Sequence, residues 1–303
     1  MKDIKFLEKL NVANTSIQKH LGDSLKPFGS DKIADGMRYA VLGGKGLRGF
    51  LVMESAALMG VPETNAISVG AAVEALHTYS LVHDDLPCMD DDDLRRGVPT
   101  VHKKWDEATA VLVGDALQTF AFELLSRSAC SNDPNIRLIL ISSLARAVGA
   151  QGMVLGQAQD IAAETSTRPL NLKEISELQR NKTGALIEWS AVAGAVLSGE
   201  DPKALRIYSR ALGLAFQIAD DILDVEGDIT IVGKAVGKDN EAGKATFVSL
   251  LGLAPAKLRA QALADEACDA LVPFGDRAVM LKKLAQFVVS RKKLKGQIYV
   301  WPS

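Results

Sequence analysis

The sequence predicts an all-α fold, a bundle of long helices, on three observations. Apolar residues recur every three or four positions almost throughout the chain, which is the spacing of one face of an α-helix. Alternating apolar and polar runs, typical of half-buried strands, are hard to find. Several periodic stretches exceed the average helix of roughly 11 residues. These stretches are rich in Ala and Leu and apolar over much of their surface, which indicates that some lie inside a bundle.

The stretch 64–86 is the clearest predicted helix, and we expect a Thr or Asn cap at its start. The residues of one helix face there are Ala66, Val69, Val73, Leu76, Ser80 and His83. The same periodicity predicts helices over 108–128, 135–163, 172–197 and 202–225. Glycines and prolines mark the breaks between these stretches, and none of the breaks is a long linker. We therefore expect a single domain over residues 1–303.

Composition and charge narrow the class of protein. Of the 303 residues, 48% are hydrophobic and 24% charged, as in ordinary globular proteins. The formal charge of −2 argues against broad electrostatic binding to nucleic acid or to a membrane. The three cysteines stand far apart, as free thiols of a reducing compartment do. The amino terminus lacks the apolar core of a signal peptide, and no apolar run reaches about 18 residues. We therefore expect a cytoplasmic protein without a membrane span.

The most unusual segment, 83–97, carries six aspartates within ten residues: Asp84, Asp85, Asp90, Asp91, Asp92 and Asp93. Carboxylates this close repel one another unless a cation compensates them. Most acidic runs are solvated loops, but Asp84 ends a strongly apolar predicted helix. Pro87 is expected to break or bulge the last turn. That bulge would bring Asp90 or Asp91 round to the side of Asp84.

A second acidic group, Asp220, Asp221 and Asp224, lies on the predicted helix 202–225. Asp220 and Asp224 are four residues apart and share a helix face, where like charges destabilise a helix by a few tenths of a kcal/mol. The residues around them are apolar, so this face is not ordinary surface. Clustered carboxylates favour hard cations, and Mg²⁺ in particular uses one or two carboxylates together with substrate phosphate oxygens. Both segments therefore predict magnesium sites that serve a phosphorylated substrate.

Basic residues stand at the predicted breaks beside these segments. Single lysines and arginines are most often solvated surface charges, but their repeated placement here predicts anion binding. Lys45 and Arg48 follow Gly43-Gly44 at a predicted helix start, where free backbone N–H groups also bind anions. The other members of the set are Arg95, Arg96, Lys182, Lys234 and Lys244. Lys182-Thr183-Gly184 interrupts a helical run, where a main-chain carbonyl could be freed. No competing zinc, nucleophile or nucleotide-binding motif stands in its required context.

The motifs DDLPCMDDDDLRRG at Asp84 and DDILD at Asp220 resemble the two aspartate-rich motifs of the trans-isoprenyl diphosphate synthases, most closely those of the bacterial farnesyl diphosphate synthases. The similarity runs from GGKGLR at Gly43 to GKAT at Lys244. It implies an isoprenoid-synthase bundle of mostly antiparallel helices around a central cavity, commonly a homodimer. It also implies Mg²⁺-dependent, head-to-tail condensation of isopentenyl diphosphate with dimethylallyl or geranyl diphosphate to give (2E,6E)-farnesyl diphosphate.

The resemblance assigns each candidate residue a role. The implied Mg²⁺ ligands, for three ions in the family's manner, are Asp84, Asp85, Asp90, Asp220 and Asp224, with Asp91 and Asp221 in support. The implied ligands of the allylic diphosphate are Arg95, Lys182, Thr183, Gln217, Lys234 and Lys244. Of these, Lys182, Thr183 and Gln217 are also the implied catalytic residues, the last two where cationic charge develops. The implied ligands of isopentenyl diphosphate are Lys45, Arg48, His77 and Arg96.

Two further points concern product and affinity. Tyr79, with Ser80 beside it, lies about one helical turn before Asp84, and its ring is expected to stop chain growth at the C15 product; simple core packing is the alternative. The family usually reads GGKRLRP, whereas this chain has Gly46 and Gly49 in place of the arginine and the proline. A positive charge is thereby lost, and we expect weaker binding of isopentenyl diphosphate.

Three other functions stay open. A geranylgeranyl diphosphate synthase would use the same chemistry to make the C20 product. A non-catalytic subunit of a prenyl synthase is expected to lack aspartates from one motif, and both motifs are complete here. A terpene cyclase would normally lack the second DDxxD and would have less need of Lys45, Arg48 and Arg96.

Overall fold

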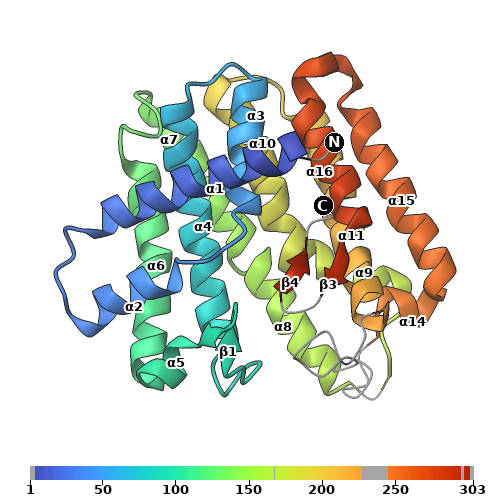
Figure 1. Ribbon diagram of the computed structural model, residues 1–303, viewed down its shortest axis with the longest axis horizontal. Coiled ribbons are helices and arrows are strands. Elements are labelled where there is room, and N and C mark those ends of the chain that lie inside the picture. The colour runs from blue at the N-terminus through green and yellow to red at the C-terminus, as the bar shows by residue number, and fades with distance from the viewer. Residues whose placement is uncertain (1–3, 167, 227–244, 295–296, 301–303) are drawn as a thin grey trace. The chain divides into compact units, whose positions relative to one another are not determined.

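The computed structural model describes residues 4–166, 168–226, 245–294 and 297–300, and within them it is helical apart from two short hairpins (Figure 1). The predicted all-α class is confirmed. The elements are α1 (Ile4–Leu25), α2 (Lys32–Ala40), α3 (Leu47–Leu58), α4 (Glu63–Asp84), β1 (Leu94–Arg95), β2 (Val98–Pro99), α5 (Val101–Lys104), α6 (Glu107–Ser126), α7 (Pro134–Val148), α8 (Met153–Glu164), α9 (Leu172–Gln179), the π-helix η1 (Arg180–Gly184), α10 (Ala185–Ser198), α11 (Lys203–Glu226), α14 (Phe247–Leu251), α15 (Leu253–Ala270), the 3₁₀-helix η2 (Val272–Ala278), α16 (Val279–Ser290), β3 (Lys292–Leu294) and β4 (Gln297–Val300).

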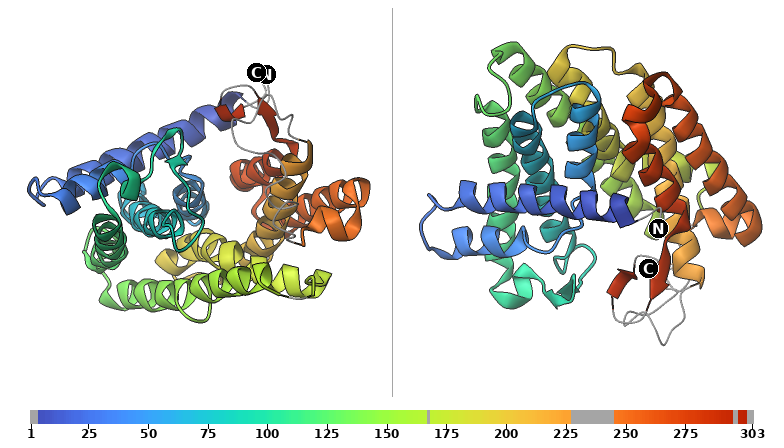
Figure 2. Two further views of the ribbon diagram at one scale, coloured as in Figure 1. Left: turned by 90° about the horizontal axis from the view of Figure 1, so that it is seen from below. Right: turned by 45° about the horizontal axis from the view of Figure 1, so that its top comes forward.

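The chain groups into two compact units, and the first comprises residues 7–141 and 193–200. In it, α4 packs against α3 and α6, and α6 also contacts α2 and α5. Figure 2 shows α3, α4 and α6 nearly end-on. Val69, Val73 and Leu76 of α4 are all 0% exposed. Because neighbours cover α4 on several sides, it can be apolar around most of its circumference.

The second unit comprises residues 1–6, 142–192 and 201–303. Its main packing is of α11 against α15 and α16, while η1 contacts α8, α9 and α11. The buried Tyr208 of α11 donates its hydroxyl hydrogen to the carbonyl oxygen of Leu281, 2.9 Å away. This bond joins α11 to α16 through a buried polar group and satisfies it. The expectation of one domain over 1–303 stays a prediction.

Two details of the predicted helices are wrong. The helix predicted over 64–86 begins at Glu63, and Pro62 holds the cap position without a side-chain hydrogen bond, so there is no Thr or Asn cap. The run predicted over 135–163 is two helices, because the chain breaks between α7 and α8. Gly152 has φ −142° and ψ −118° there, and a Cβ on it would lie 2.0 Å from the carbonyl oxygen of Ala147. Only glycine fits so close to the end of α7.

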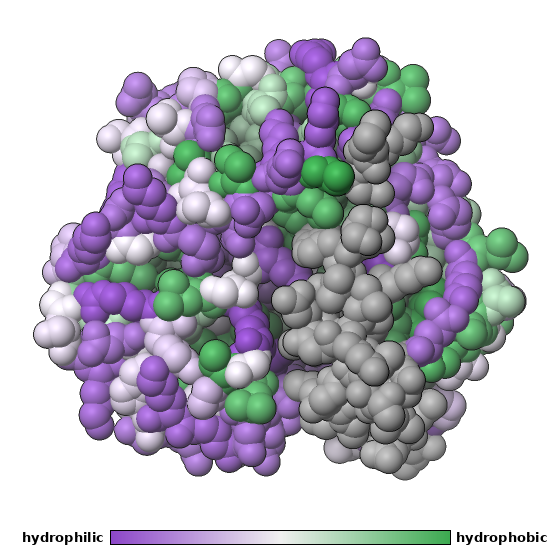
Figure 3. Space-filling view, viewed as in Figure 1, coloured by the Kyte–Doolittle hydropathy of each residue, from purple (hydrophilic) through white to green (hydrophobic). Residues whose placement is uncertain are grey.

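Two helical stretches, Glu107–Ser126 and Pro134–Glu164, are long and apolar enough to cross a membrane by length and composition alone. The first is α6, whose apolar window is 50% buried inside the fold, as in core helices of water-soluble proteins. The second is interrupted between α7 and α8. On the face seen in Figure 3, hydrophilic residues predominate and apolar residues lie in small groups between them. The expectation of no membrane span stays a prediction.

Candidate functional site

The first acidic segment forms a tight turn at the end of α4. The N–H of Met89 donates to the carbonyl oxygen of Leu86 at 2.8 Å, and the N–H of Asp90 donates to that of Asp84, also at 2.8 Å. The bulge predicted at Pro87 is therefore confirmed, and it brings the backbone of Asp90 next to that of Asp84. The Asp84 side chain is half-buried and that of Asp90 is exposed.

Arg95, at the end of β1, pairs with two aspartates of this segment. Its Nε donates to Oδ1 of Asp85 at 2.8 Å, its Nη2 donates to the same oxygen, and Nη2 lies 3.2 Å from Oδ2 of Asp92. Asp85 is 3% exposed. Burial raises the pKa of Asp85, and Arg95 acts against that rise. One guanidinium thus compensates part of the charge of the acidic turn.

A cationic cluster made of Arg48 and Arg96 lies in the same unit. Arg96 donates from Nη1 to the carbonyl oxygen of Leu42 at 2.8 Å, and its guanidinium covers Gly44. A Cβ on Gly44 would lie only 3.1 Å from Nη2 of Arg96, which explains a glycine at that position. Arg48 lies in the first turn of α3, and its Nε is buried without a hydrogen-bond partner. Burial lowers the pKa of both guanidinium groups.

His77 of α4 lies close enough to this cluster for the charges of Arg48 and Arg96 to act on its imidazole ring. Burial is the largest cause that holds its pKa well below 6.5, followed by Arg48, Arg96 and Arg95. His77 is therefore neutral at pH 7 and can donate one hydrogen bond to an anion. The structure thus brings together three of the four residues predicted for isopentenyl diphosphate. The fourth, Lys45, is exposed in the turn before α3.

Gly46 and Gly49, the two departures from the family pattern, have local structural roles. Gly46 caps α3 with a left-handed φ of 65°, a conformation that favours glycine over arginine. The N–H of Gly49 donates to Oε1 of Glu74 at 2.8 Å, and Glu74 is 4% exposed. A proline has no N–H to make this bond. In this chain, therefore, Gly49 gives the buried Glu74 carboxylate a partner.

We expect Gly49→Pro to destabilise the protein by about 1–3 kcal/mol, because it leaves a buried carboxylate without that donor. Gly49→Ala is the matched control, since it keeps the N–H. Both side chains meet Cδ1 of Ile17, 2.4 Å from an ideal Cβ, so this clash is common to the two variants, while the proline ring also restricts the backbone of Arg48. Urea denaturation measures both free energies of unfolding. Equal values for the two variants would remove the Glu74 bond from the account.

Tyr79 is 7% exposed. Its ring meets that of His83 edge-on at 5.5 Å between centroids, and burial raises its pKa. Next to it, the Ser80 hydroxyl donates to the carbonyl oxygen of His77 at 2.9 Å. These contacts are compatible with both interpretations of Tyr79, chain-length control and core packing.

The second acidic segment lies near the end of α11 in the other unit. Arg291, 8% exposed, donates from Nη2 to Oδ1 of Asp220 at 2.9 Å. Its guanidinium carbon also lies 4.2 Å from the ring centroid of Phe216. Asp221 accepts a hydrogen bond from the N–H of Phe247 at 2.7 Å. Asp224 and Gln217 are half-buried on α11.

The interruption predicted at Lys182-Thr183-Gly184 is the π-helix η1. Such π turns occur often at functional sites. Lys182 donates from Nζ to Oδ2 of Asp160 at 2.6 Å, and a Cβ on Gly156 would lie 2.1 Å from the backbone nitrogen of Lys182. Thr183 is half-buried. The predicted Lys234 and Lys244 lie outside the described residues.

A cavity of about 640 Å³ lies in this unit, lined in part by Arg180, Gly184, Arg206 and Arg210. Lys182, Thr183 and Gln217, the site residues described for this unit, are not among its lining residues. The cavity therefore flanks η1 without containing the side chains that the sequence predicts to be functional.

The donor set of the two acidic segments fits Mg²⁺. All the side-chain groups in question are carboxylates, the hard oxygen ligands that this ion prefers. Arg95 donates to one oxygen of Asp85 and Arg291 to one oxygen of Asp220, which orients these carboxylates. Ligating carboxylates are commonly oriented by such outer hydrogen bonds.

Sequence reasoning missed several partners of the predicted residues. Asp160 and Arg291 stand 22 and 71 positions from the residues they pair with, so no local pattern announces them. Glu74 and His102 were also missed, although both lie near the predicted segments. The signal in the sequence that could have found them is their position. Each is an acidic or histidine residue that stands close in the chain to residues of opposite charge or to other possible metal ligands.

Comparisons with known proteins agree with one another. The family model described as Polyprenyl synthetase matches residues 30–270. Farnesyl diphosphate synthase of Haemophilus influenzae is 42% identical over 301 residues, which is 95% of this chain and 99% of the relative. Geranylgeranyl pyrophosphate synthase 11 of Arabidopsis thaliana, a chloroplastic protein, is 42% identical over 86% of this chain and 74% of its own length.

Solved structures give the same result. The crystal structure of an FPP/GFPP synthase from Zymomonas mobilis superimposes with a TM-score of 0.86 at 45% identity. The match covers 95% of this chain and 99% of that chain. The similarity therefore extends over nearly the whole sequence, including both acidic segments.

Proposed function

The chain belongs to the polyprenyl synthetase family, and from this premise we propose that it is a Mg²⁺-dependent prenyltransferase that makes (2E,6E)-farnesyl diphosphate. Its substrates are isopentenyl diphosphate and dimethylallyl or geranyl diphosphate, joined head-to-tail with release of diphosphate. The observation that carries the proposal is that one unit holds both an acidic turn, at Asp84 and Asp90, and a cationic cluster, at Arg48 and Arg96. A terpene cyclase, which binds one diphosphate, would have less need of that cluster.

For the metal, we assign Mg²⁺ to Asp84, Asp85, Asp90, Asp220 and Asp224, with about three ions per active site. When bound, Mg²⁺ neutralises charge on the leaving diphosphate. Arg95 and Lys182 add fixed positive charge for the allylic diphosphate, each held in place by an aspartate partner. Lys234 and Lys244 belong to the same set on the family resemblance.

The remaining residues have distinct tasks. Arg48 and Arg96, with Lys45, bind the diphosphate of isopentenyl diphosphate, because guanidinium groups match the geometry of phosphate oxygens. Neutral His77 donates a hydrogen bond to the same anion. Thr183, through its carbonyl, and Gln217, through its amide, stabilise the allylic cation while water is excluded. The isopentenyl double bond then attacks this cation, and a proton is lost to the departing diphosphate.

Product analysis tests the proposal directly. The protein is incubated with dimethylallyl diphosphate, isopentenyl diphosphate and Mg²⁺, and the products are separated by chromatography. We expect a C15 product. A dominant C20 product would favour a geranylgeranyl diphosphate synthase, the activity for which the Arabidopsis thaliana relative is named. Absence of Mg²⁺-dependent diphosphate release would favour the non-catalytic subunit.

We expect Tyr79→Ala to lengthen the product beyond C15, because it removes a buried ring five residues before Asp84. The measurement is the ratio of C20 to C15 product under the same conditions. Tyr208→Phe is a control at a buried tyrosine of the other unit, and its ratio should stay at the wild-type value. An unchanged ratio in Tyr79→Ala would leave core packing as the role of Tyr79.

We also propose that the protein is a cytoplasmic homodimer. Large apolar side chains stand exposed as two adjacent pairs in one unit: Val111 (41%) and Leu112 (52%) on α6, and Leu138 (63%) and Ile139 (50%) on α7. Exposed apolar surface of this kind is a candidate protein interface. Light scattering of the purified protein gives the mass in solution, and a monomer mass would contradict the dimer.

A further inference from the structure

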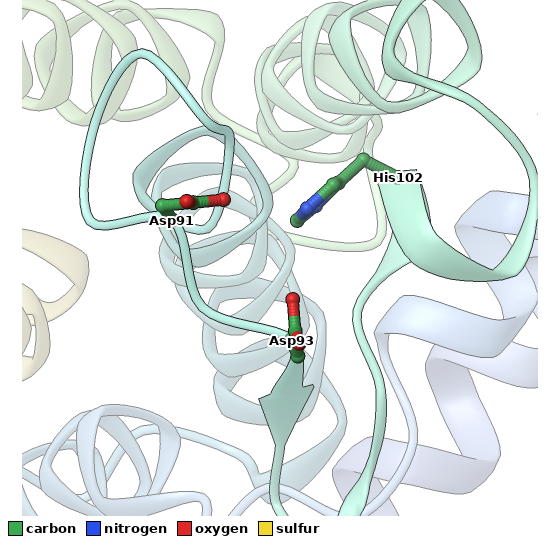
Figure 4. Close-up of side chains that lie close together, drawn as sticks. All are labelled: Asp91, Asp93 and His102. Atoms are coloured by element: carbon green, nitrogen blue, oxygen red, sulfur yellow. The ribbon is translucent and has the colours of Figure 1, made fainter.

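Three side chains of the first unit gather beside the proposed magnesium ligands: Asp93, His102 and Asp91, which the resemblance places only in support of those ligands (Figure 4). One ligand atom of each lies within 4.8 Å of the others. Asp91 and Asp93 belong to the loop before β1, and His102 to the short helix α5. The two carboxylates are exposed, whereas His102 is only 7% exposed. In Figure 4 the imidazole ring points into the space between the two aspartates.

The hydrogen bonds around His102 determine which ring nitrogen is free. The hydroxyl of Thr100 lies 2.9 Å from the carbonyl oxygen of Asp92 and donates its single hydrogen there. It must then accept from Nδ1 of His102, 3.2 Å away. A ring with a single hydrogen therefore carries it on Nδ1 and has a lone pair on Nε2. That Nε2 is buried without any hydrogen-bond partner.

A buried lone pair beside two carboxylates needs a positively charged partner. A buried polar atom without a partner is costly, and here its neighbours are acceptors, which cannot supply a hydrogen. A cation satisfies all three groups at once. Three ligands bound 2.0–2.2 Å from one ion stand about 3.3–3.8 Å apart, so ligand atoms up to 4.8 Å apart have to close by about 1 Å. Lys103 occupies Oδ1 of Asp93 at 2.8 Å and leaves that carboxylate its second oxygen.

The ligand types select the ion. Two carboxylates and one imidazole form a mixed oxygen and nitrogen set, which suits Mn²⁺ or Zn²⁺ better than Mg²⁺. The Nδ1 hydrogen bond to Thr100 is the outer contact that metal-binding histidines usually make, and it fixes the ring tautomer. Asp92 of the same loop pairs with Arg95. An ion bound by Asp91, Asp93 and His102 would therefore also link that loop to α5.

We propose that Asp91, Asp93 and His102 form a site for one divalent transition-metal ion, of the class of Mn²⁺ and Zn²⁺, separate from the proposed magnesium ligands. The proposal does not depend on prenyl transfer. Its consequence is that this protein binds manganese through a nitrogen ligand without any diphosphate present.

Electron paramagnetic resonance of Mn²⁺ tests the site on the full-length protein, with excess Mg²⁺ to occupy all-oxygen sites. Pulsed spectra report ¹⁴N coupling when a histidine ligates the ion, and carboxylate sites give none. We expect one nitrogen-coupled Mn²⁺ per chain. His102→Ala should abolish the coupling, and Thr100→Val should weaken binding by about 10- to 100-fold through loss of the outer contact.

Four further variants complete the test. Asp91→Asn and Asp93→Asn change exposed side chains, so folding is retained, and each should lower Mn²⁺ affinity at least tenfold. His20→Ala, a histidine of α1 far along the chain, should keep the coupling. Asp84→Asn should keep it too, even if prenyl transfer is lost, which separates this site from the proposed active site. Wild-type spectra without ¹⁴N coupling, or coupling that survives in His102→Ala, would overturn the proposal.

Discussion

Asp84→Asn is expected to lower kcat for prenyl transfer by about a hundred- to a thousandfold, the effect of removing one group that stabilises developing charge. The substitution removes a negative charge and keeps the size of the side chain. Asp84 is the last residue of α4, where a negative charge is unfavourable to the helix dipole. The variant should therefore fold at least as stably as the wild type, and its loss of activity cannot be attributed to unfolding.

The measurement is steady-state turnover at saturating Mg²⁺, accompanied by thermal unfolding followed by circular dichroism. Asp23→Asn is the matched control, since Asp23 is an exposed aspartate of α1 that pairs with its neighbour Lys26. Its turnover should equal that of the wild type. A turnover of Asp84→Asn within tenfold of the wild type would contradict the assignment of Asp84 as a magnesium ligand.

Arg48→Met is expected to raise KM for isopentenyl diphosphate by about ten- to a hundredfold. Hydrogen bonds to charged groups contribute about 1.5–3 kcal/mol, and 1.4 kcal/mol is tenfold in affinity. Met fills much of the space of the arginine stem, so the change removes charge more than packing. Because Arg48 lowers the pKa of His77, the variant should also raise that pKa toward its ordinary value.

A comparison of KM for isopentenyl diphosphate with KM for the allylic substrate decides which of the two Arg48 binds. KM for the allylic substrate should stay within about twofold of the wild type, while KM for isopentenyl diphosphate rises. Arg48→Lys should restore part of the affinity, since it keeps the charge but not the planar donors. Arg127→Met, at an exposed arginine paired with Glu123, is the control. A rise in the allylic KM alone would move Arg48 to the other substrate.

The helices could be predicted from the sequence because their signal is local. Apolar periodicity and the punctuation by glycine and proline located α4, α6 and α11 within a few residues. The break between α7 and α8 was missed, since Gly149 and Gly152 look like ordinary glycines in an apolar run. What forces the break is the approach of Gly152 to the carbonyl oxygen of Ala147, a contact that exists only in the folded chain.

Some features of the candidate site could likewise be predicted from the sequence, and others depend on tertiary packing. Pro87 predicted the turn that places Asp90 beside Asp84, because proline acts on its own backbone and that of its neighbours. The glycines at 46 and 49 looked like a loss of positive charge. The structure adds the left-handed cap at Gly46 and the hydrogen bond from Gly49 to Glu74. These depend on where α3 and α4 pack, which no short stretch of sequence specifies.

By itself, then, the sequence determined the helical class, the two acidic segments and the basic residues beside them, because residue type and spacing along one helix carry that information. Tertiary structure alone decided the partners: Asp85 with Arg95, Lys182 with Asp160, Asp220 with Arg291, and His102 with its free Nε2. Such pairs form where separate elements pack. The charges of these pairs are therefore compensated by neighbours that lie on other elements of the fold.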